Sequence, residues 1–186
     1  MQKLNFGSAH DRIEGFTNVD AMDWNGNTDI IHDMTSFPYP FLDNSAEEIR
    51  SVESLEHISF RFAERVVAEW YRILKVGGKL HIQVPDAGKA MEYYVNNQIC
   101  ECCAHKPRDI KDAHGSRGCP VCGGNGMIHP NRWLYTFTGA QKHPYDQHLN
   151  IFTQQSMRKY LVRAGFSEIK FNPDEYGWKL KVEAIK

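Results

Sequence analysis

Residues 59–86 indicate an amphipathic helix that leads directly into a β-strand. The apolar residues of the first part recur every four positions, which places them on one helical face: Phe62, Val66, Trp70 and Leu74. Lys75 in the last turn and the glycines at 77 and 78 predict the end of this helix, because glycine adopts the left-handed conformation that closes helices. Residues 79–86 then alternate apolar and polar side chains, as strands do, and Pro85 ends the run. A helix followed at once by a strand favours an α/β fold.

Further apolar runs on either side extend this alternation of helix and strand. Strands are expected at residues 3–6, 16–19, 29–31 and 48–54, although the last run carries several charges. Helices are expected at residues 87–98 and 152–165, the second ending at Gly165. Residues 167–171 and 178–185 predict two closing strands joined by a turn. The order predicts an α/β sheet with a final antiparallel hairpin.

Length and charge set limits on the domain and its partners. A chain of 186 residues fits one domain, residues 1–186, with its own core. The net charge of -1 gives no overall field that would draw the protein to nucleic acid or to an anionic membrane. No apolar run approaches the roughly 20 residues that cross a bilayer, and the first residues lack the apolar block of a signal peptide. We therefore expect a cytoplasmic protein with no membrane partner, and the oligomeric state is left open.

All five cysteines lie in a polar insertion at residues 99–132. Two C-x-x-C pairs separated by fifteen residues have the spacing of a four-thiolate zinc site: Cys100, Cys103, Cys119 and Cys122. Four thiolates leave no open coordination position, so such a zinc ion would be structural and would hold the insertion together. Free thiols and a redox pair are the alternatives, with Cys102 left over. Acidic residues dilute the basic ones here, so nucleic-acid binding through the insertion is a minority alternative.

Four stretches, in this order, resemble the short class I S-adenosylmethionine (SAM)-dependent methyltransferases of the type 11 group: "KLNFGSAHDRIEGFTNVD", "DMTSFPYPFLDNSAEEIRSVESLEH", "EWYRILKVGGKLHIQVPD" and "GAQKHPYDQHLNIFTQQSMRKYLVRAGF". The resemblance covers most of the chain outside residues 99–132. It implies a Rossmann-like, mostly parallel sheet with a truncated first helix. Such a truncation accounts for the thirteen residues from Gly7 to Asp20, where a complete strand, helix and strand need about 30. It also implies methyl transfer from SAM to an acceptor that the sequence does not identify.

The resemblance places the cofactor contacts where strands end, and ligands of open parallel sheets bind beyond the carboxyl ends of the strands. It implies five cofactor-binding residues: Gly7 at the methionine portion, Asp20 at the ribose hydroxyls, Asp33 and Met34 at the adenine, and Glu53 after the fourth strand. Asp33 has turn or helix capping as an alternative role. The family's second glycine is missing, because Ser8, Ala9 and His10 follow Gly7, and only glycine reaches positive φ at no steric cost. A binding or scaffold protein that lost catalysis is therefore the alternative to an enzyme.

The candidate catalytic residues are two histidines, His148 and His57. In-line methyl transfer depends mainly on positioning, so a base is optional, but imidazole titrates near neutrality, at about 6.5, and can take a proton from an acceptor hydroxyl or amine. The resemblance places His148 on the substrate side, whereas His57 has packing against the next helix as its alternative role. Gln141 and Tyr145 are candidate substrate contacts in the aromatic stretch 133–148, which would form a lid over the acceptor, an ordinary core or a surface loop.

Overall fold

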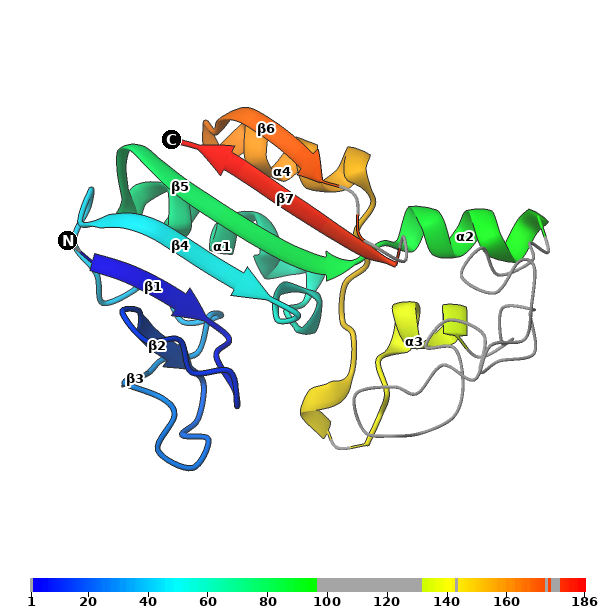
Figure 1. Cartoon of the computed structure of the whole chain (residues 1–186), viewed down its shortest axis with the longest axis horizontal. Helices are drawn as coiled ribbons and strands as arrows, with labels where there is room; N and C mark the ends of the chain where they lie inside the picture. The colour runs from blue at the N-terminus through cyan, green and yellow to red at the C-terminus, as the bar shows by residue number, and fades with distance from the viewer. Residues whose placement is uncertain (1, 97–131, 143, 173, 175–177) are drawn as a thin grey trace.

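A computed structural model describes residues 2–96, 132–142, 144–172, 174 and 178–186. Its centre is one seven-stranded sheet in the order β3-β2-β1-β4-β5-β7-β6 (Figure 1). The strands are β1 (Gln2–Phe6), β2 (Thr17–Asp20), β3 (Ile30–Ile31), β4 (Ala46–Val52), β5 (Leu74–Pro85), β6 (Ser167–Asn172) and β7 (Lys179–Ile185). Strands β1 to β5 pair in parallel, whereas β7 runs antiparallel to both β5 and β6. The expected parallel sheet with an antiparallel C-terminal hairpin is confirmed.

The helices α1 (Phe60–Ile73) and α4 (Gln154–Ala164) lie behind the sheet in Figure 1. The expected stripe of α1 is largely inward, since Val66 and Trp70 are fully buried, but Phe62 is 40% exposed. Met157 and Leu161 are the buried residues of α4. Gly165 ends that helix in the left-handed conformation with φ 107°, as expected. The helices α2 (Ala87–Asn96) and α3 (Arg132–Thr138) lie beyond the carboxyl end of β5 and contact each other. Two short 3-10 helices, η1 (Leu55–His57) and η3 (Pro144–Asp146), complete the elements of the described residues.

The expected end of the first helix near Gly78 is wrong. The helix α1 stops at Ile73, and Leu74 is already extended, with φ -63° and ψ 138°. Leu74 pairs with Ala46 of β4, and the Gly77 N–H donates to the carbonyl of Lys186 at 2.9 Å. From Leu74 onward the backbone therefore forms hydrogen bonds with strands that are distant in the sequence instead of helical ones. Lys75 lies in β5 and not in the last turn of the helix.

The sheet face opposite α1 and α4 is polar. Alternate residues of each strand point away from the core, and on this face their charges pair across strands. Glu48 of β4 accepts from Lys3 of β1 at 2.8 Å and lies 3.6 Å from His81 of β5, and His81 also lies 3.9 Å from Glu183 of β7. The described part of the protein is therefore a two-layer structure around most of its sheet, consistent with the missing first helix. No described helix combines the length and apolar character needed to cross a membrane.

Candidate functional site

Strand β1 ends in a left-handed turn at Gly7, which lies against the chain leaving β4. Gly7 has φ +70°, and its N–H donates to the carbonyl of Val19 at 2.9 Å. A Cβ at this position would lie 2.2 Å from the Cβ of Ser54, so only glycine fits. The Ser54 hydroxyl in turn donates to the carbonyl of Phe6 at 3.3 Å. This contact brings the carboxyl ends of β1, β2 and β4 together at the edge where the sequence predicts the cofactor.

Asp20 ends β2 as predicted, but the loops around it already use its carboxylate. Oδ2 accepts from the backbone N–H of Ala9 at 2.9 Å, and Oδ1 accepts from Nε1 of Trp24 at 3.0 Å. The Trp24 ring packs edge to face with His10 at a centroid distance of 4.7 Å, and Ala9 takes a positive φ of 41°. A carboxylate has about four lone-pair sites, so Asp20 retains capacity for a ribose hydroxyl but shares it with Trp24. The sequence reasoning missed Trp24.

Asp33 and Met34 lie just past β3, beside the end of β2. Oδ1 of Asp33 accepts from the backbone N–H of Thr35 at 2.7 Å and from its hydroxyl at 2.8 Å, which is the capping arrangement foreseen as an alternative. Met34 is half-buried and packs against the core, while its carbonyl accepts from the Tyr39 hydroxyl at 2.8 Å. Because Asp20 pairs with Ile31 across β2 and β3, both acids lie at the same sheet edge.

Glu53 joins this edge to a neighbouring cavity. It follows β4 with a positive φ of 50°, a conformation that costs a side-chain-bearing residue about 1–2 kcal/mol. Its backbone N–H donates to the carbonyl of Gln83 at 2.8 Å, which holds the turn in place. Its carboxylate forms an ion pair with Lys179 at the start of β7.

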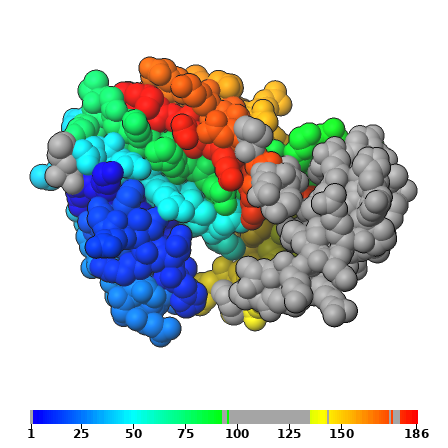
Figure 2. All heavy atoms as spheres, viewed as in Figure 1, coloured from blue at the N-terminus to red at the C-terminus, as the bar shows by residue number. Residues whose placement is uncertain are grey.

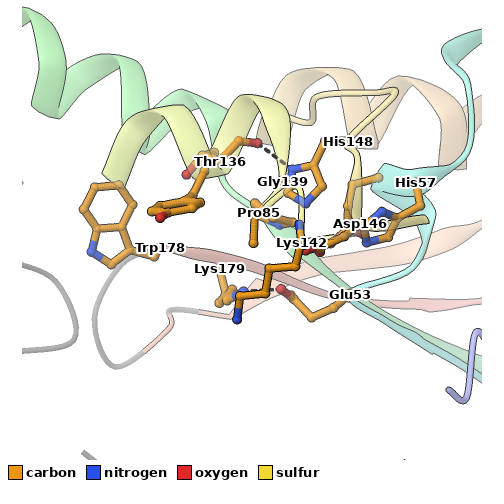
Figure 3. A pocket seen from close by; sticks show the side chains of 13 residues that line it. Glu53, His57, Pro85, Thr136, Gly139, Lys142, Asp146, His148, Trp178 and Lys179 are labelled. Carbon is orange, nitrogen blue, oxygen red and sulfur yellow. Dashed lines mark hydrogen bonds and ion pairs between the residues drawn. The ribbon is translucent and has the colours of Figure 1, made fainter. Parts of the chain in front are cut away.

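A cavity of about 490 Å³ opens beyond the carboxyl ends of β4 and β5, under α3 and the segment that follows it (Figure 3). In Figure 2 the surface is indented between the N-terminal loops in blue and the segment after α3 in yellow. The cavity is lined by residues from five parts of the fold: Glu53, Glu56, His57, Pro85, Tyr135, Thr136, Gly139, Ala140, Lys142, Asp146, His148, Trp178 and Lys179. Its volume lies in the range of small-molecule sites.

The two predicted histidines, His57 and His148, both line this cavity and lie next to each other, although 90 residues lie between them in the sequence. The ring centroids lie 5.0 Å apart with the planes nearly perpendicular. Nδ1 of His57 lies 3.0 Å from the carbonyl of Gln147, and Nδ1 of His148 lies 2.9 Å from the carbonyl of Thr136. A carbonyl can only accept, so each Nδ1 carries a proton, and in a neutral ring of this tautomer Nε2 carries the lone pair. Burial lowers the pKa of His148, which favours the neutral ring that can accept a proton or a cation.

Glu56 is the site residue that the sequence reasoning missed. It is 1% exposed, and neither carboxylate oxygen has a hydrogen-bond partner within the described residues. Burial, with a contribution from the charge of Glu53, raises the pKa of Glu56 to about 8. Its position beside His57 in "LEH" was the available signal, but nothing in the sequence shows that the carboxylate points inward.

Gln141 and Tyr145, the candidate substrate contacts, occupy exposed positions next to residues that line the cavity. Gln141 has a positive φ of 55°, and Tyr145 lies in η3 with 65% of its surface exposed. Neither side chain belongs to the described lining. The predicted zinc ligands Cys100, Cys103, Cys119 and Cys122 lie outside the described residues.

Comparison with known proteins finds one matching family model and several solved structures of similar fold. Residues 17–82 match the family model described as a methyltransferase domain. A SAM-dependent methyltransferase, possible histamine N-methyltransferase, from Thermotoga maritima superposes with a TM-score of 0.58 at 14% identity, over 100% of this chain and 82% of that one. A SAM-dependent methyltransferase from Mesorhizobium loti gives 0.52 at 15%, over 100% and 90%.

A possible exported protein from Bordetella parapertussis gives a TM-score of 0.58 at 13% identity, over 100% of this chain and 61% of that one. No curated protein sequence matches the chain. At such identities the solved structures establish the fold, and the matched segment agrees with it. The predicted resemblance to class I SAM-dependent methyltransferases is therefore confirmed, with its Rossmann-like sheet.

Proposed function

We propose, from the class I methyltransferase fold and the cavity beside its strand ends, that this protein transfers a methyl group from SAM to an acceptor bound in that cavity. The observation that carries the proposal is the convergence of β1, β2 and β4 at Gly7 and Ser54, immediately next to a cavity lined by two histidines. Ligands of parallel sheets bind at such strand ends. The acceptor's identity does not follow from the fold, because one fold carries many chemistries.

The residues at the strand ends fit SAM in part. The left-handed turn at Gly7 brings backbone close to where the methionine portion would bind, and Asp20 offers a carboxylate to the ribose. The buried hydroxyl of Ser8 has no partner within the described residues, so it is available to a polar group of a ligand. SAM would supply an electrophilic methyl group, and Glu53 stands between this side and the cavity.

The acceptor side would act mainly by positioning. The carbon–sulfur bond breaks as the acceptor's lone pair forms the new bond to the methyl carbon, so holding the two in line supplies most of the acceleration. An acceptor hydroxyl or amine would give its proton to Nε2 of His148, which the Thr136 carbonyl orients through Nδ1. His57 would be the second candidate base.

Calorimetry with S-adenosylhomocysteine tests the proposal without knowledge of the acceptor. We expect saturable binding, weakened more than about tenfold in Asp20→Ala, because two charge-assisted hydrogen bonds exceed the 1.4 kcal/mol that corresponds to tenfold. Asp23→Ala is the matched control, since Asp23 lies in the same loop and its carboxylate accepts from Gly26 at 2.9 Å. Unchanged affinity in Asp20→Ala would contradict the assignment.

A non-catalytic binding protein with this fold is the second candidate, and one observation favours it. The Trp24 indole and the Ala9 N–H already use the carboxylate that a ribose would need. This candidate predicts no heat of binding with S-adenosylhomocysteine for a folded sample, and saturable binding excludes it.

We also propose a structural zinc ion at Cys100, Cys103, Cys119 and Cys122, on the strength of their spacing. Elemental analysis of the full chain should find zinc, and Cys119→Ser should lower its content while leaving the far-ultraviolet dichroism of the sheet unchanged. Wild-type protein without zinc would refute this proposal.

A further inference from the structure

The cavity contains a second set of potential metal ligands, separate from the cysteines. One ligand atom from each of Glu56, His57 and His148 lies within 4.8 Å of the other two. Donor atoms around a single ion at about 2.1 Å are about 3–3.5 Å apart, so the three groups need to approach by only about 1–2 Å. Two imidazoles and one carboxylate form a ligand set that binds first-row divalent metals such as iron and zinc.

The carboxyl group of Glu56 is the observation that points to a missing partner. It is 99% buried, and neither of its oxygens has a hydrogen-bond partner within the described part of the chain, although buried polar atoms nearly always have one. Protonation would remove the charge but add an O–H donor that also needs a partner, whereas a cation at the centre of the cluster would engage an oxygen directly. A bound cation would therefore account for the isolated, buried carboxyl group of Glu56.

The two histidines each make the second contact that metal-ligating imidazoles usually make. A ligating imidazole usually donates its other N–H to a carbonyl or carboxylate, which fixes the ring and its tautomer. His57 and His148 both do so, toward the carbonyls of Gln147 and Thr136. Each Nε2 is left as a donor atom for a metal.

The backbone holds the three residues in place from two distant segments. Leu149 and Asn150, which follow His148, donate their N–H groups to the carbonyl of Glu56 at 2.8 and 3.0 Å. His148 itself donates to the carbonyl of Thr138 at 3.3 Å. The segment that carries one histidine is therefore tied to η1, which carries the other two ligands, so the cluster is preorganised without any metal.

The charged side chains around the cluster largely balance one another, so a cation would be held by its ligands and not by an overall negative potential of the cavity. The ammonium groups of Lys142 and Lys179 line the same cavity as the carboxyl groups of Glu53 and Asp146. Lys179 and Glu53 neutralise each other in their ion pair. A cation would be held here by its ligands, and an anionic or oxygen-bearing acceptor would find both a lysine and the metal.

We propose that Glu56, His57 and His148 bind a divalent first-row transition metal whose remaining coordination positions face the cavity. Three protein ligands leave such positions open, as in catalytic metal sites. In the metal-loaded protein both imidazoles are ligands, so neither serves as a base. The site does not depend on methyl transfer, because metal binding can be measured without SAM or its product.

Titration of the chelator-treated full chain with Mn²⁺, followed by electron paramagnetic resonance, tests this proposal. Mn²⁺ prefers oxygen and nitrogen ligands to thiolates, so the cysteines contribute little to the signal. We expect one bound ion per chain, and affinity weakened roughly tenfold or more in Glu56→Gln and in His148→Gln. His81→Gln is the matched control, because His81 lies on the polar sheet face and is not part of the cluster.

A second measurement locates the ion and covers variants that lose their fold. In the wild-type protein, bound Mn²⁺ should broaden the imidazole resonances of His57 and His148 at lower Mn²⁺ occupancy than those of His81. Thermal melts of the metal-free variants show whether they are folded. No Mn²⁺ binding at millimolar concentration, unchanged affinity in both variants, or equal broadening of all three histidines would overturn the proposal. Binding of S-adenosylhomocysteine is measured separately, so failure of the metal site and failure of the methyltransferase proposal give different results.

Discussion

Replacement of Gly7 by alanine should destabilise the protein far more than replacement of another left-handed glycine. A positive φ costs any residue with a Cβ about 1 kcal/mol. At Gly7 the new methyl group would also lie 2.2 Å from the Ser54 Cβ and 2.6 Å from its Oγ. Such overpacking typically adds about 1–3 kcal/mol, so we expect a total loss of about 2–4 kcal/mol in the free energy of unfolding.

Gly15→Ala provides the matched control for this prediction. Gly15 has φ +81°, and a Cβ there meets nothing within 4 Å, so only the conformational cost of about 1 kcal/mol applies. Urea denaturation measures both variants. Adding Ser54→Gly to Gly7→Ala removes the clash, and the double-mutant cycle should give a favourable coupling of about 1–3 kcal/mol. Equal destabilisation by Gly7→Ala and Gly15→Ala would refute the close approach of the two strand ends.

Three further predictions follow from the same structure. Trp24→Phe removes the indole that donates to Asp20 at 3.0 Å, so calorimetry should show tighter binding of S-adenosylhomocysteine, and weaker binding would mean that Trp24 supports the cofactor. The pKa of Asp29 is lowered from its ordinary value of 3.8, mainly because the backbone N–H of Asn18 donates to its carboxylate. The ionised carboxylate therefore stabilises the fold, and this contribution to the free energy of unfolding is lost as the pH falls from 3.8 through the lower pKa of the folded protein. Asp29→Asn should reduce the loss of stability at acid pH in urea melts, and an unchanged acid dependence would contradict this. The guanidinium group of Arg72 donates to the carboxylate of Glu69 and to the carbonyl of Phe41, and lysine cannot make both bonds. Arg72→Lys should therefore lower the free energy of unfolding by about 1–3 kcal/mol. An unchanged free energy in urea melts would show that these bonds do not stabilise the fold.

The sheet was predictable from the sequence because local pattern and tertiary burial agree there. Leu80, Ile82 and Val84 alternate with polar residues, and the structure buries all three on the helix side of β5. The end of α1 was not predictable in the same way. Its helical pattern continues through Leu74, but that residue pairs with Ala46, and a sheet partner that distant leaves no mark on a local pattern.

The candidate site likewise contains residues that the sequence could predict and residues that only the structure reveals. The resemblance placed Gly7 and Asp20 at strand ends and His148 on the acceptor side, and the structure brings these positions to one edge and one cavity. Trp24 was missed because its bond to Asp20 depends on how the shortened loop folds back. Glu56 was missed because "LEH" does not show which way its middle side chain points.

The sequence alone determined the order of the strands and of the helices other than α3, and the residue types carried by the strand ends. Hydrophobic periodicity and turn residues act over a few positions, so helices, strands and the residues at their ends are encoded in the local sequence. The tertiary structure decided that Glu56 is buried without a partner and that His57 and His148 share its cavity. This arrangement depends on packing and on hydrogen bonds between segments about 90 residues apart, and these set distances that a local sequence pattern does not encode.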